Sequence, residues 1–272
     1  MKFPKGVTEA IVLVQDICAE LGVDVVVVGA IAYGAWLEDP WRSTSDVDLA
    51  VALDLDDLQE LKSRLTTAGF ERDRQQEHRW YAPNHVPVDF ILAGPKLRES
   101  KEIRWPETGT VMSLLGFEHV FREAVAFEVR PGRTIKIVSL PVYALLKIAA
   151  YFDRPEAGRD VRDIASLLER YEKESDLRFS TPVLDAGVAF QEAGAYLLGL
   201  DLGNLCSADE ADLVERFIQM ATDRDSRGYT QLVKLAPSIL GDDKETAVVA
   251  QIDAFGRGFH EARKAHSNPT RT

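Results

Sequence analysis

The feature that most constrains this chain is a run of four valines, Val25–Val28, followed directly by Gly29. Consecutive β-branched residues favour a strand that is buried on both faces, because branching at Cβ restricts the side chain in a helix. Residues 30–38 then change to a helix-like pattern. A glycine at such a junction leaves the first N–H groups of the helix open to approach, and these groups favour phosphate. The junction therefore predicts a phosphate-binding turn at the end of a buried strand.

Two aspartates, Asp46 and Asp48, stand two residues apart at the head of the next predicted strand, 46–53. Alternate residues of a strand point to the same face, with Cα atoms about 6.5 Å apart. The two carboxylates can therefore share one or two divalent cations. The opposite face is apolar and can anchor the strand in a core; it carries Val47, Leu49, Val51 and Leu53. A phosphate-binding turn beside paired carboxylates is typical of an enzyme that handles nucleoside triphosphates.

A third carboxylate, Asp89, lies inside the strand-like run V-P-V-D-F-I-L at 86–92. Burying it without a partner would be costly. Metal coordination beside Asp46 and Asp48 would remove that cost. It would also complete a triad in which two acids bridge the ions and the third orients or deprotonates the attacking hydroxyl. The alternative is an ion pair between Asp89 and one arginine of the preceding segment: Arg72, Arg74 or Arg79.

These motifs resemble the DNA polymerase β-type nucleotidyltransferase superfamily, whose signature is Gly-Ser or Gly-Gly, a spacer, and then Asp-x-Asp. Within it, the AbiEii/AbiGii-type abortive-infection toxins carry Arg-x-Ser/Thr-x-Asp-x-Asp, which is similar to Arg42-Ser43-Thr44-Ser45-Asp46-Val47-Asp48 here. The resemblance implies catalytic and metal-binding roles for Asp46, Asp48 and Asp89, and nucleotide contacts for Gly29, Ala30, Arg42 and Thr44. Ala30 departs from the signature, so phosphate contact would rest on backbone amides and on other side chains.

A lone lysine, Lys147, is the only charged residue between Leu140 and Phe152. In so apolar a helix, a lysine either extends its ammonium to water or faces an anion. In the next predicted helix, 159–173, the acids Asp160 and Asp163 share a face. A purely structural reading makes Asp160 an N-cap and Asp163 a favourable charge in the first turn.

The same toxin branch shows a similar progression after its sheet, Lys-x-x-Ala, Asp-Arg and then Arg/Lys-Asp-x-x-Asp. In this chain the matching positions are Lys147, Ala150, Asp153-Arg154, Arg159-Asp160 and Asp163. The resemblance implies that Lys147 is catalytic and binds nucleotide, and that Arg154, Asp160 and Asp163 contact the nucleotide.

The order of the predicted strands and helices along the chain indicates an α+β fold. A polymerase β-type nucleotidyltransferase domain, a small mixed sheet with helices, would occupy residues 1–138. An all-helical domain, 139–272, would complete the active-site cleft. The glycines and prolines of 93–110 predict an irregular insertion, and 182–200 reads as one helix. Within that helix, the small residues of 191–199 indicate close packing between helices.

The distribution of charged residues along the sequence limits which acceptor molecule the protein can bind. The net charge is −12; residues 1–83 hold 8 basic and 15 acidic residues, and 171–272 hold 11 and 17. An RNA acceptor needs a basic face. The middle of the chain offers the only candidates, Lys96, Arg98, Lys101, Arg104, Arg122, Arg130, Arg133 and Lys136.

Nothing in the sequence resembles a signal peptide or a membrane helix, and its two cysteines, Cys18 and Cys206, lie far apart. These features indicate no membrane partner, no disulfide framework and a cytoplasmic setting.

The leading hypothesis is a nucleotidyltransferase that uses Mg²⁺ or Mn²⁺ and moves an NMP from an NTP to an acceptor hydroxyl, releasing pyrophosphate. By resemblance, the acceptor is tRNA or protein, and the chain is the toxin of a toxin–antitoxin or phage-defence pair with a cognate antitoxin. One alternative is a catalytically inactive nucleotide-binding regulatory module, which Ala30 favours. Another is a small-molecule nucleotidyltransferase of the aminoglycoside type, since an acidic chain suits a cationic acceptor.

Overall fold

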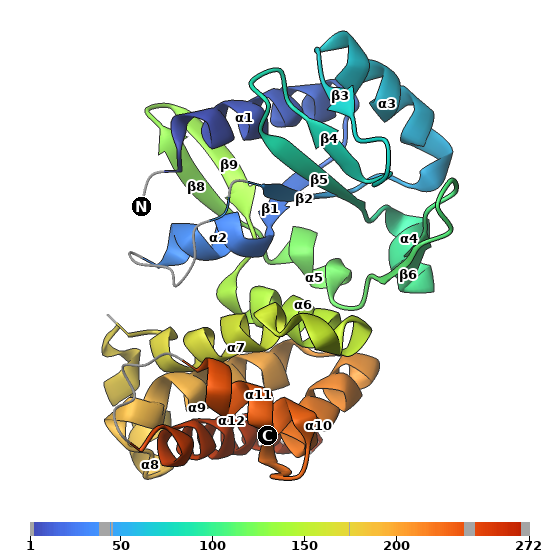
Figure 1. The fold of residues 1–272 in the computed structure, drawn as a ribbon. Helices are drawn as coiled ribbons and strands as arrows, with labels where there is room; N and C mark the ends of the chain where they lie inside the picture. The colour runs from blue at the N-terminus through green and yellow to red at the C-terminus, as the bar shows by residue number, and fades with distance from the viewer. Residues whose placement is uncertain (1–2, 38–43, 45, 174, 237–242, 268–272) are drawn as a thin grey trace. The chain divides into compact units, whose positions relative to one another are not determined.

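A computed structural model describes residues 3–37, 44, 46–173, 175–236 and 243–267. It confirms the α+β fold, in which a mixed sheet with helices precedes an all-helical half (Figure 1). The chain divides into two compact units, Met1–Tyr143 and Ala144–Thr272, called the head and the helical unit below. The assignment of 1–138 and 139–272 to two functional domains stays a prediction. In the described part of the chain, no helix is both long and apolar enough to cross a membrane.

The head is built on a seven-stranded sheet of order β3-β4-β5-β2-β1-β9-β8. The strands are β1 Val25–Val28, β2 Val47–Val51, β3 Glu71–Arg72, β4 Arg79–Tyr81, β5 Pro87–Leu92, β8 Val125–Arg130 and β9 Arg133–Ile137. The sheet is mixed, because β2 runs antiparallel to β1 but parallel to β5, and β1 runs parallel to β9. Its central strands are buried, as their β-branched and apolar residues predict.

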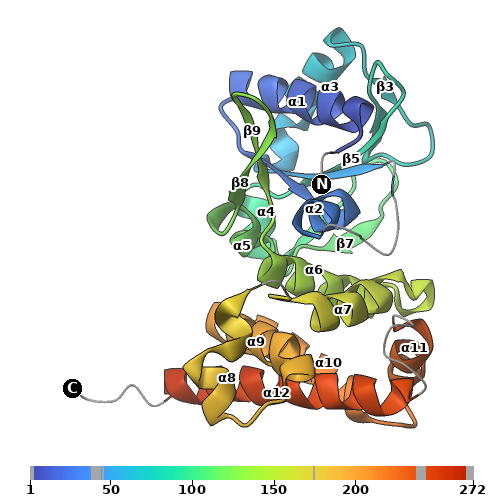
Figure 2. The same cartoon turned by 90° about the vertical axis from the view of Figure 1, so that its left-hand side faces the viewer.

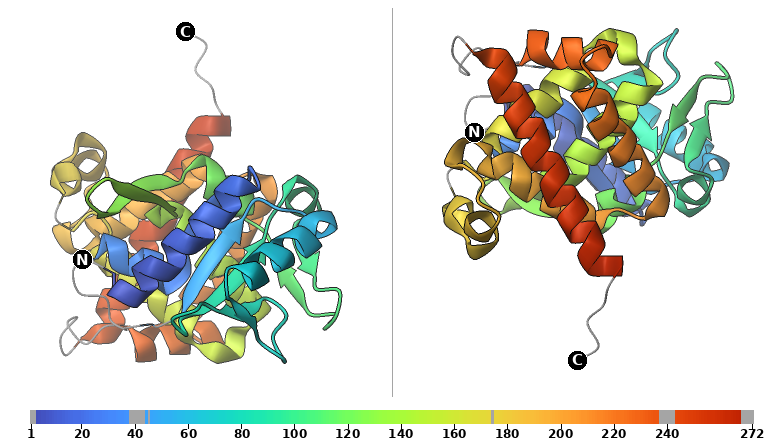
Figure 3. Two further views of the ribbon diagram at one scale, coloured as in Figure 1. Left: turned by 90° about the horizontal axis from the view of Figure 1, so that it is seen from above. Right: turned by 90° about the horizontal axis from the view of Figure 1, so that it is seen from below.

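Helices flank the sheet: α1 Lys5–Glu20, α2 Gly29–Trp36, α3 Leu58–Thr67 after a 3-10 turn at Leu55–Asp57, and α5 Phe117–Arg122. Helices α1 and α3 contact each other, and α1 also contacts β1, β2 and β9. In Figures 1 and 3, α1 lies over one face of the sheet, and Figure 1 shows α2 on the opposite side. The buried residues of α1 recur at helical spacing, which explains its position against the sheet.

The prediction of an irregular insertion at 93–110 is wrong. This segment forms helix α4, Pro95–Ser100, and strand β6, Glu102–Arg104, which pairs with β7, Val111–Ser113. Asp54 accepts hydrogen bonds from the backbone N–H groups of Lys96 and Leu97, so a residue remote in sequence caps α4. Ile103 and Trp105 are buried and anchor the small β6–β7 sheet. Neither the remote cap nor three-residue strands leave a periodic signal in the sequence.

The helical unit contains helices α6 to α12, of which α6 begins in the head (Figure 2). They are α6 Leu140–Asp153, α7 Arg159–Arg170, α8 Thr181–Asp185, α9 Phe190–Leu205, α10 Ala208–Thr222, α11 Arg227–Leu235 and α12 Lys244–Ser267, with 3-10 turns at Pro155–Ala157 and Asp176–Phe179. The prediction of one helix over 182–200 is wrong. The chain breaks between α8 and α9, where Gly187 has φ +62°, a conformation that ends a helix.

Helices α9 and α12 pack backbone against backbone, as the small residues of 191–199 predict. A Cβ atom added to Gly199 would lie 2.1 Å from the carbonyl oxygen of Phe255, and one added to Gly258 would lie 2.1 Å from that of Tyr196. Each helix therefore presents a glycine to the other's backbone. The right-hand view of Figure 3 shows α12 running the length of the unit as its longest helix.

Candidate active site

Strand pairing places Asp48, Asp89 and Arg79 in one row across the head sheet. The two aspartates are predicted site residues, and Arg79 is one of the arginines named as an alternative partner of Asp89. Val28 of β1 pairs with Asp48 of β2, Asp48 with Asp89 of β5, and Asp89 with Arg79 of β4. Residues paired in register point to the same face of a sheet. Asp48, Asp89 and Arg79 therefore share a face at one end of their strands.

Gly29 adjoins this row because it follows Val28 and begins α2. Its φ is +67°, and a Cβ atom added here would lie 1.9 Å from Oδ2 of Asp48. The Asp48 carboxylate thus lies directly against the backbone of Gly29. Ala30, the next residue of the helix, is buried. The geometry brings the predicted acid and the predicted phosphate turn together; the nucleotide contacts of Gly29 and Ala30 stay predictions.

Gly29→Ala is expected to destabilise the head by about 1–3 kcal/mol, because alanine is strained at this φ and its methyl group would displace the Asp48 carboxylate. Urea unfolding measures the loss. Gly22→Ala is the matched control, since Gly22 has φ +69° and no atom within 4 Å of the added methyl. It isolates the cost of the backbone conformation. Equal losses in the two variants would contradict the close contact between Gly29 and Asp48.

Arg79 is the arginine that pairs with Asp89. Its Nε donates to Oδ1 of Asp89 at 2.6 Å, and its Nη2 donates to Oδ2 at 2.6 Å. The same Nη2 lies 3.4 Å from Oδ2 of Asp46. This bidentate geometry is the strong form of an arginine–carboxylate pair. The hydrogen bonds to Asp89 also raise the pKa of Arg79. Arg72 instead pairs with Glu107, at 2.8 Å.

Asp46 lies just before β2, and its side chain is more exposed than that of Asp89. Its Oδ1 accepts a hydrogen bond from the hydroxyl of Thr44. Thr44 therefore touches a predicted metal ligand, while its contact with nucleotide stays a prediction. Arg42, the remaining predicted nucleotide contact of the motif, lies outside the described residues.

We call Asp46, Asp48 and Asp89 the acid cluster. Carboxylate oxygens are the ligands that Mg²⁺ and Mn²⁺ prefer, so the donor type fits a divalent cation. The positions of the side chains, in contrast to their chemical type, do not form a metal site. Within the described ranges, no three His, Cys, Asp or Glu side chains are grouped so as to hold a metal ion. The Arg79 guanidinium bridges two of the three acids instead. The metal-binding role of the cluster stays a prediction.

The remaining predicted residues form a second group, the lysine cluster, in the helical unit. Lys147 Nζ lies 3.0 Å from Oδ1 of Asp160 and 2.7 Å from Oδ2 of Asp163. Arg154 Nε donates to Oδ2 of Asp160 at 2.8 Å. Lys147, Asp160 and Asp163 are 8%, 2% and 0% exposed. Lys147 therefore faces two anions of its own unit; contacts of this cluster with nucleotide stay predictions.

The structure corrects the predicted position of Asp160 in its helix and shows what holds its carboxyl group ionised. Gly158, not Asp160, is the N-cap of α7, so the N-cap reading is wrong and both acids lie within the helix. Burial raises the pKa of the Asp160 carboxyl, but Lys147 and Arg154 more than offset this, and the net shift is downward. Asp160 is thus held ionised by two cations.

The basic residues of 84–140 do not form one patch. Several of them pair with carboxylates in the head: Lys96 with Asp56, Arg98 with Glu118, Arg122 with Glu123, Arg133 with Asp16, and Lys136 with Asp24. Lys96 and Arg98 lie on α4, whereas Arg133 and Lys136 lie on β9, at the other side of the sheet (Figure 1). These side chains scatter, which is the arrangement that disfavours an RNA acceptor.

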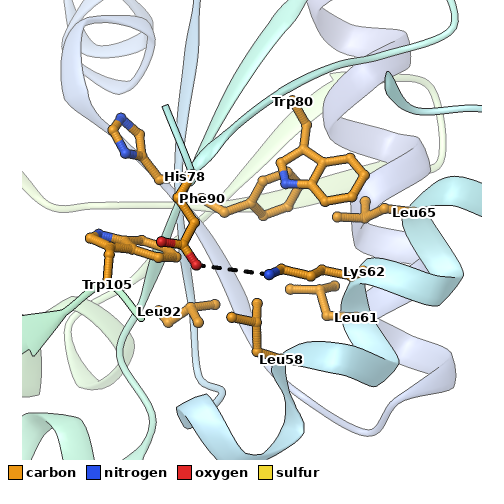
Figure 4. A pocket seen from close by; sticks show the side chains of 10 residues that line it. Leu58, Leu61, Lys62, Leu65, His78, Trp80, Phe90, Leu92 and Trp105 are labelled. Carbon is orange, nitrogen blue, oxygen red and sulfur yellow. Dashed lines mark ion pairs between the residues drawn. The ribbon is translucent and has the colours of Figure 1, made fainter. Parts of the chain in front are cut away.

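An enclosed cavity of about 10 Å³ lies between α3 and strands β4 and β5 (Figure 4). Its wall includes the buried Glu77, which lies 3.8 Å from Lys62 Nζ, and also His78, beside Arg79. Burial lowers the pKa of His78, and the charge of Asp89 opposes that shift. Space for about one water molecule cannot admit a nucleotide. The cavity is therefore part of the core and not the binding site.

No protein-family model and no curated protein matches this chain. It is similar to several solved structures, among them the following three. A nucleotidyltransferase-like antigen of Paracoccidioides brasiliensis has 21% identity, covering 58% of this chain and 72% of that one, with a TM-score of 0.39. A putative nucleotidyltransferase from H. pylori has 13% identity over 96% and 98%, TM-score 0.41. The antibiotic-resistance factor ANT(2'')-Ia has 13% identity over 97% and 99%, TM-score 0.35. The similarity is weak in sequence and in backbone.

Proposed function

We propose that this chain is a metal-dependent nucleotidyltransferase that moves an NMP from an NTP to an acceptor hydroxyl and releases pyrophosphate. One observation carries the proposal: Asp48 lies against the glycine that begins α2, and Asp89 is its register partner on the neighbouring strand. A phosphate can approach the N–H groups of this turn only if a cation neutralises the adjacent carboxylate. Carboxylates beside a phosphate-binding turn are therefore suited to a nucleotide that arrives with its metal.

The acid cluster would hold Mg²⁺ or Mn²⁺. When bound, the ion would offset the charge of the phosphates and favour ionisation of the attacking hydroxyl. Because Gly29 has no side chain, a phosphate oxygen would reach its backbone once the cation neutralises Asp48, and Ala30 would add only its N–H group. Asp89, which is buried and pairs in register with Asp48, would orient the hydroxyl and accept its proton.

The biological setting is a narrower proposal. The resemblance of the Arg42–Asp48 motif and of the Lys147–Asp163 progression supports a toxin of a toxin–antitoxin or phage-defence pair, with a cognate antitoxin and a cytoplasmic location. The scattered, paired basic residues favour a protein or small cationic acceptor over tRNA.

An inactive nucleotide-binding module is the second candidate. Two observations favour it: Ala30 replaces the usual hydroxyl or glycine, and Arg79 occupies two members of the acid cluster.

Transfer of label separates the two candidates. The purified chain is incubated with each of the four NTPs carrying an α-³²P label, MgCl₂ or MnCl₂, and one acceptor at a time: total protein, total tRNA or an aminoglycoside. An active enzyme is expected to label one acceptor class, and EDTA is expected to abolish the labelling. Nucleotide binding without transfer to any acceptor would support the inactive module.

A further inference from the structure

Arg79 contacts two members of the acid cluster, Asp89 and Asp46, and the proposed reaction does not require these contacts. We propose that its guanidinium is a resident cation, which a divalent ion must displace from Asp89 and Asp46 before the cluster can bind metal. Arg79 then sets the metal affinity of the site. Metal-free and metal-loaded chains would differ in the partner of this one side chain.

The contacts show why the two cations exclude each other. Both carboxylate oxygens of Asp89 accept hydrogen bonds from Arg79, at 2.6 Å each. Its Nη2 also faces Asp46 at 3.4 Å. A divalent ion that bound these oxygens would lie within a few ångströms of a permanent positive charge, and like charges at that separation repel strongly in a partly buried site. The ion and the guanidinium therefore compete for the same oxygens.

The surroundings of Arg79 allow it to leave. Its side chain is 23% exposed, and that of Asp46 is 39% exposed, so the guanidinium has a route to water. Strand β4 has three residues and only the two-residue β3 lies outside it, so Arg79 is close to the edge of the sheet. The lysine cluster differs in this respect, because the side chains of Lys147 and Asp163 are 10% and 0% exposed. A buried pair of that kind has no comparable exit.

Metal binding tests the displacement directly. Mn²⁺ is titrated into the full chain by calorimetry, without nucleotide, for the unmodified protein and Arg79→Gln. Breaking a two-bonded charged pair is expected to weaken metal binding in the unmodified chain, so Arg79→Gln should bind Mn²⁺ about tenfold more tightly or better. Equal or weaker binding by Arg79→Gln would overturn the proposal.

Arg72→Gln is the matched control. Arg72 lies on the adjacent strand, is 31% exposed and pairs with Glu107, which is not in the acid cluster. Its loss should change Mn²⁺ affinity less than about twofold, since it removes a charge without freeing a ligand. A tenfold gain in Arg72→Gln as well would show that net charge alone sets the affinity, and would also overturn the proposal.

Arg79→Lys covers the case in which Arg79→Gln does not fold. Lysine keeps the charge but cannot donate two parallel hydrogen bonds, so this variant should bind Mn²⁺ several-fold more tightly than the unmodified chain. Affinity equal to that of the unmodified chain would count against displacement.

The inference rests on the proposed function, because both need the acid cluster to bind a divalent ion. Their failures are nevertheless distinguishable. Tighter Mn²⁺ binding without transfer of label would sustain the role of Arg79 and reject the enzyme. Metal-dependent transfer with no change of affinity in Arg79→Gln would do the opposite.

Discussion

Asp48→Asn is expected to reduce nucleotidyl transfer by about a thousandfold or more, the range found when a central catalytic group is removed. Asparagine is close to aspartate in shape, so it fits against Gly29, but it lacks the negative charge that the cation needs. The fold should be retained, because one fewer charge in a cluster of three carboxylates relieves repulsion in the metal-free chain. Label transfer and a thermal melt measure the two effects.

Asp56→Asn is the control for this result. Asp56 is an exposed acid of the same unit, and it pairs with Lys96 on the surface. Transfer should be unchanged in this variant. Persistence of transfer in Asp48→Asn would reject the acid cluster as the active site, whatever the other variants show.

Lys147→Met is expected to destabilise the chain by about 3–5 kcal/mol, the cost of removing one partner from a buried ion pair. Methionine fills the space of the apolar stem, but it leaves the carboxylates of Asp160 and Asp163 without the ammonium between them. Urea unfolding measures the change. Since the folded pKa of Asp160 is lowered, its contribution is complete above the unfolded value of about 3.9 and is lost as the pH falls through the folded pKa.

The double variant Lys147→Met/Asp163→Asn isolates the cause, because it removes one of the two carboxylates together with the lysine. Much of the lost stability should return, while Asp160 keeps Arg154 as a partner. Lys96→Met, at an exposed pair, should change stability little. If Lys147→Met lowers transfer but leaves stability unchanged, the lysine acts on the nucleotide and its structural role is rejected.

Local sequence patterns are sufficient to predict the two strands and the strand–helix junction that carry the site. The valine run gave β1, the alternation after Asp46 gave β2, and Gly29 marked the junction of β1 with α2. Each of these signals is local, since β-branching and residue alternation act within one strand. The position of Asp89 beside Asp48 is predicted differently, by the cost of burying a lone carboxylate and by the family resemblance.

Pairing across the sheet could not be predicted in the same way. Three arginines precede Asp89, and spacing does not choose between them. The antiparallel register of β4 with β5 selects Arg79, and that register depends on the turn between Tyr81 and Pro87. The break between α8 and α9 and the cap that Asp54 gives to α4 also depend on tertiary structure.

The place of β1 in the sheet has a consequence for how the chain folds. β1 pairs with β2, which follows soon after it, but its other edge pairs with β9, where Val27 meets Ile137. Trp36 donates a hydrogen bond to the carbonyl of Val138 as well. During synthesis the acid-bearing strands can assemble early, yet one edge of β1 stays unpaired until the hairpin that contains β9 has emerged. Long-range strand closure is slow and leaves an open strand edge, so we expect the nascent head to be prone to aggregation until β9 pairs with β1.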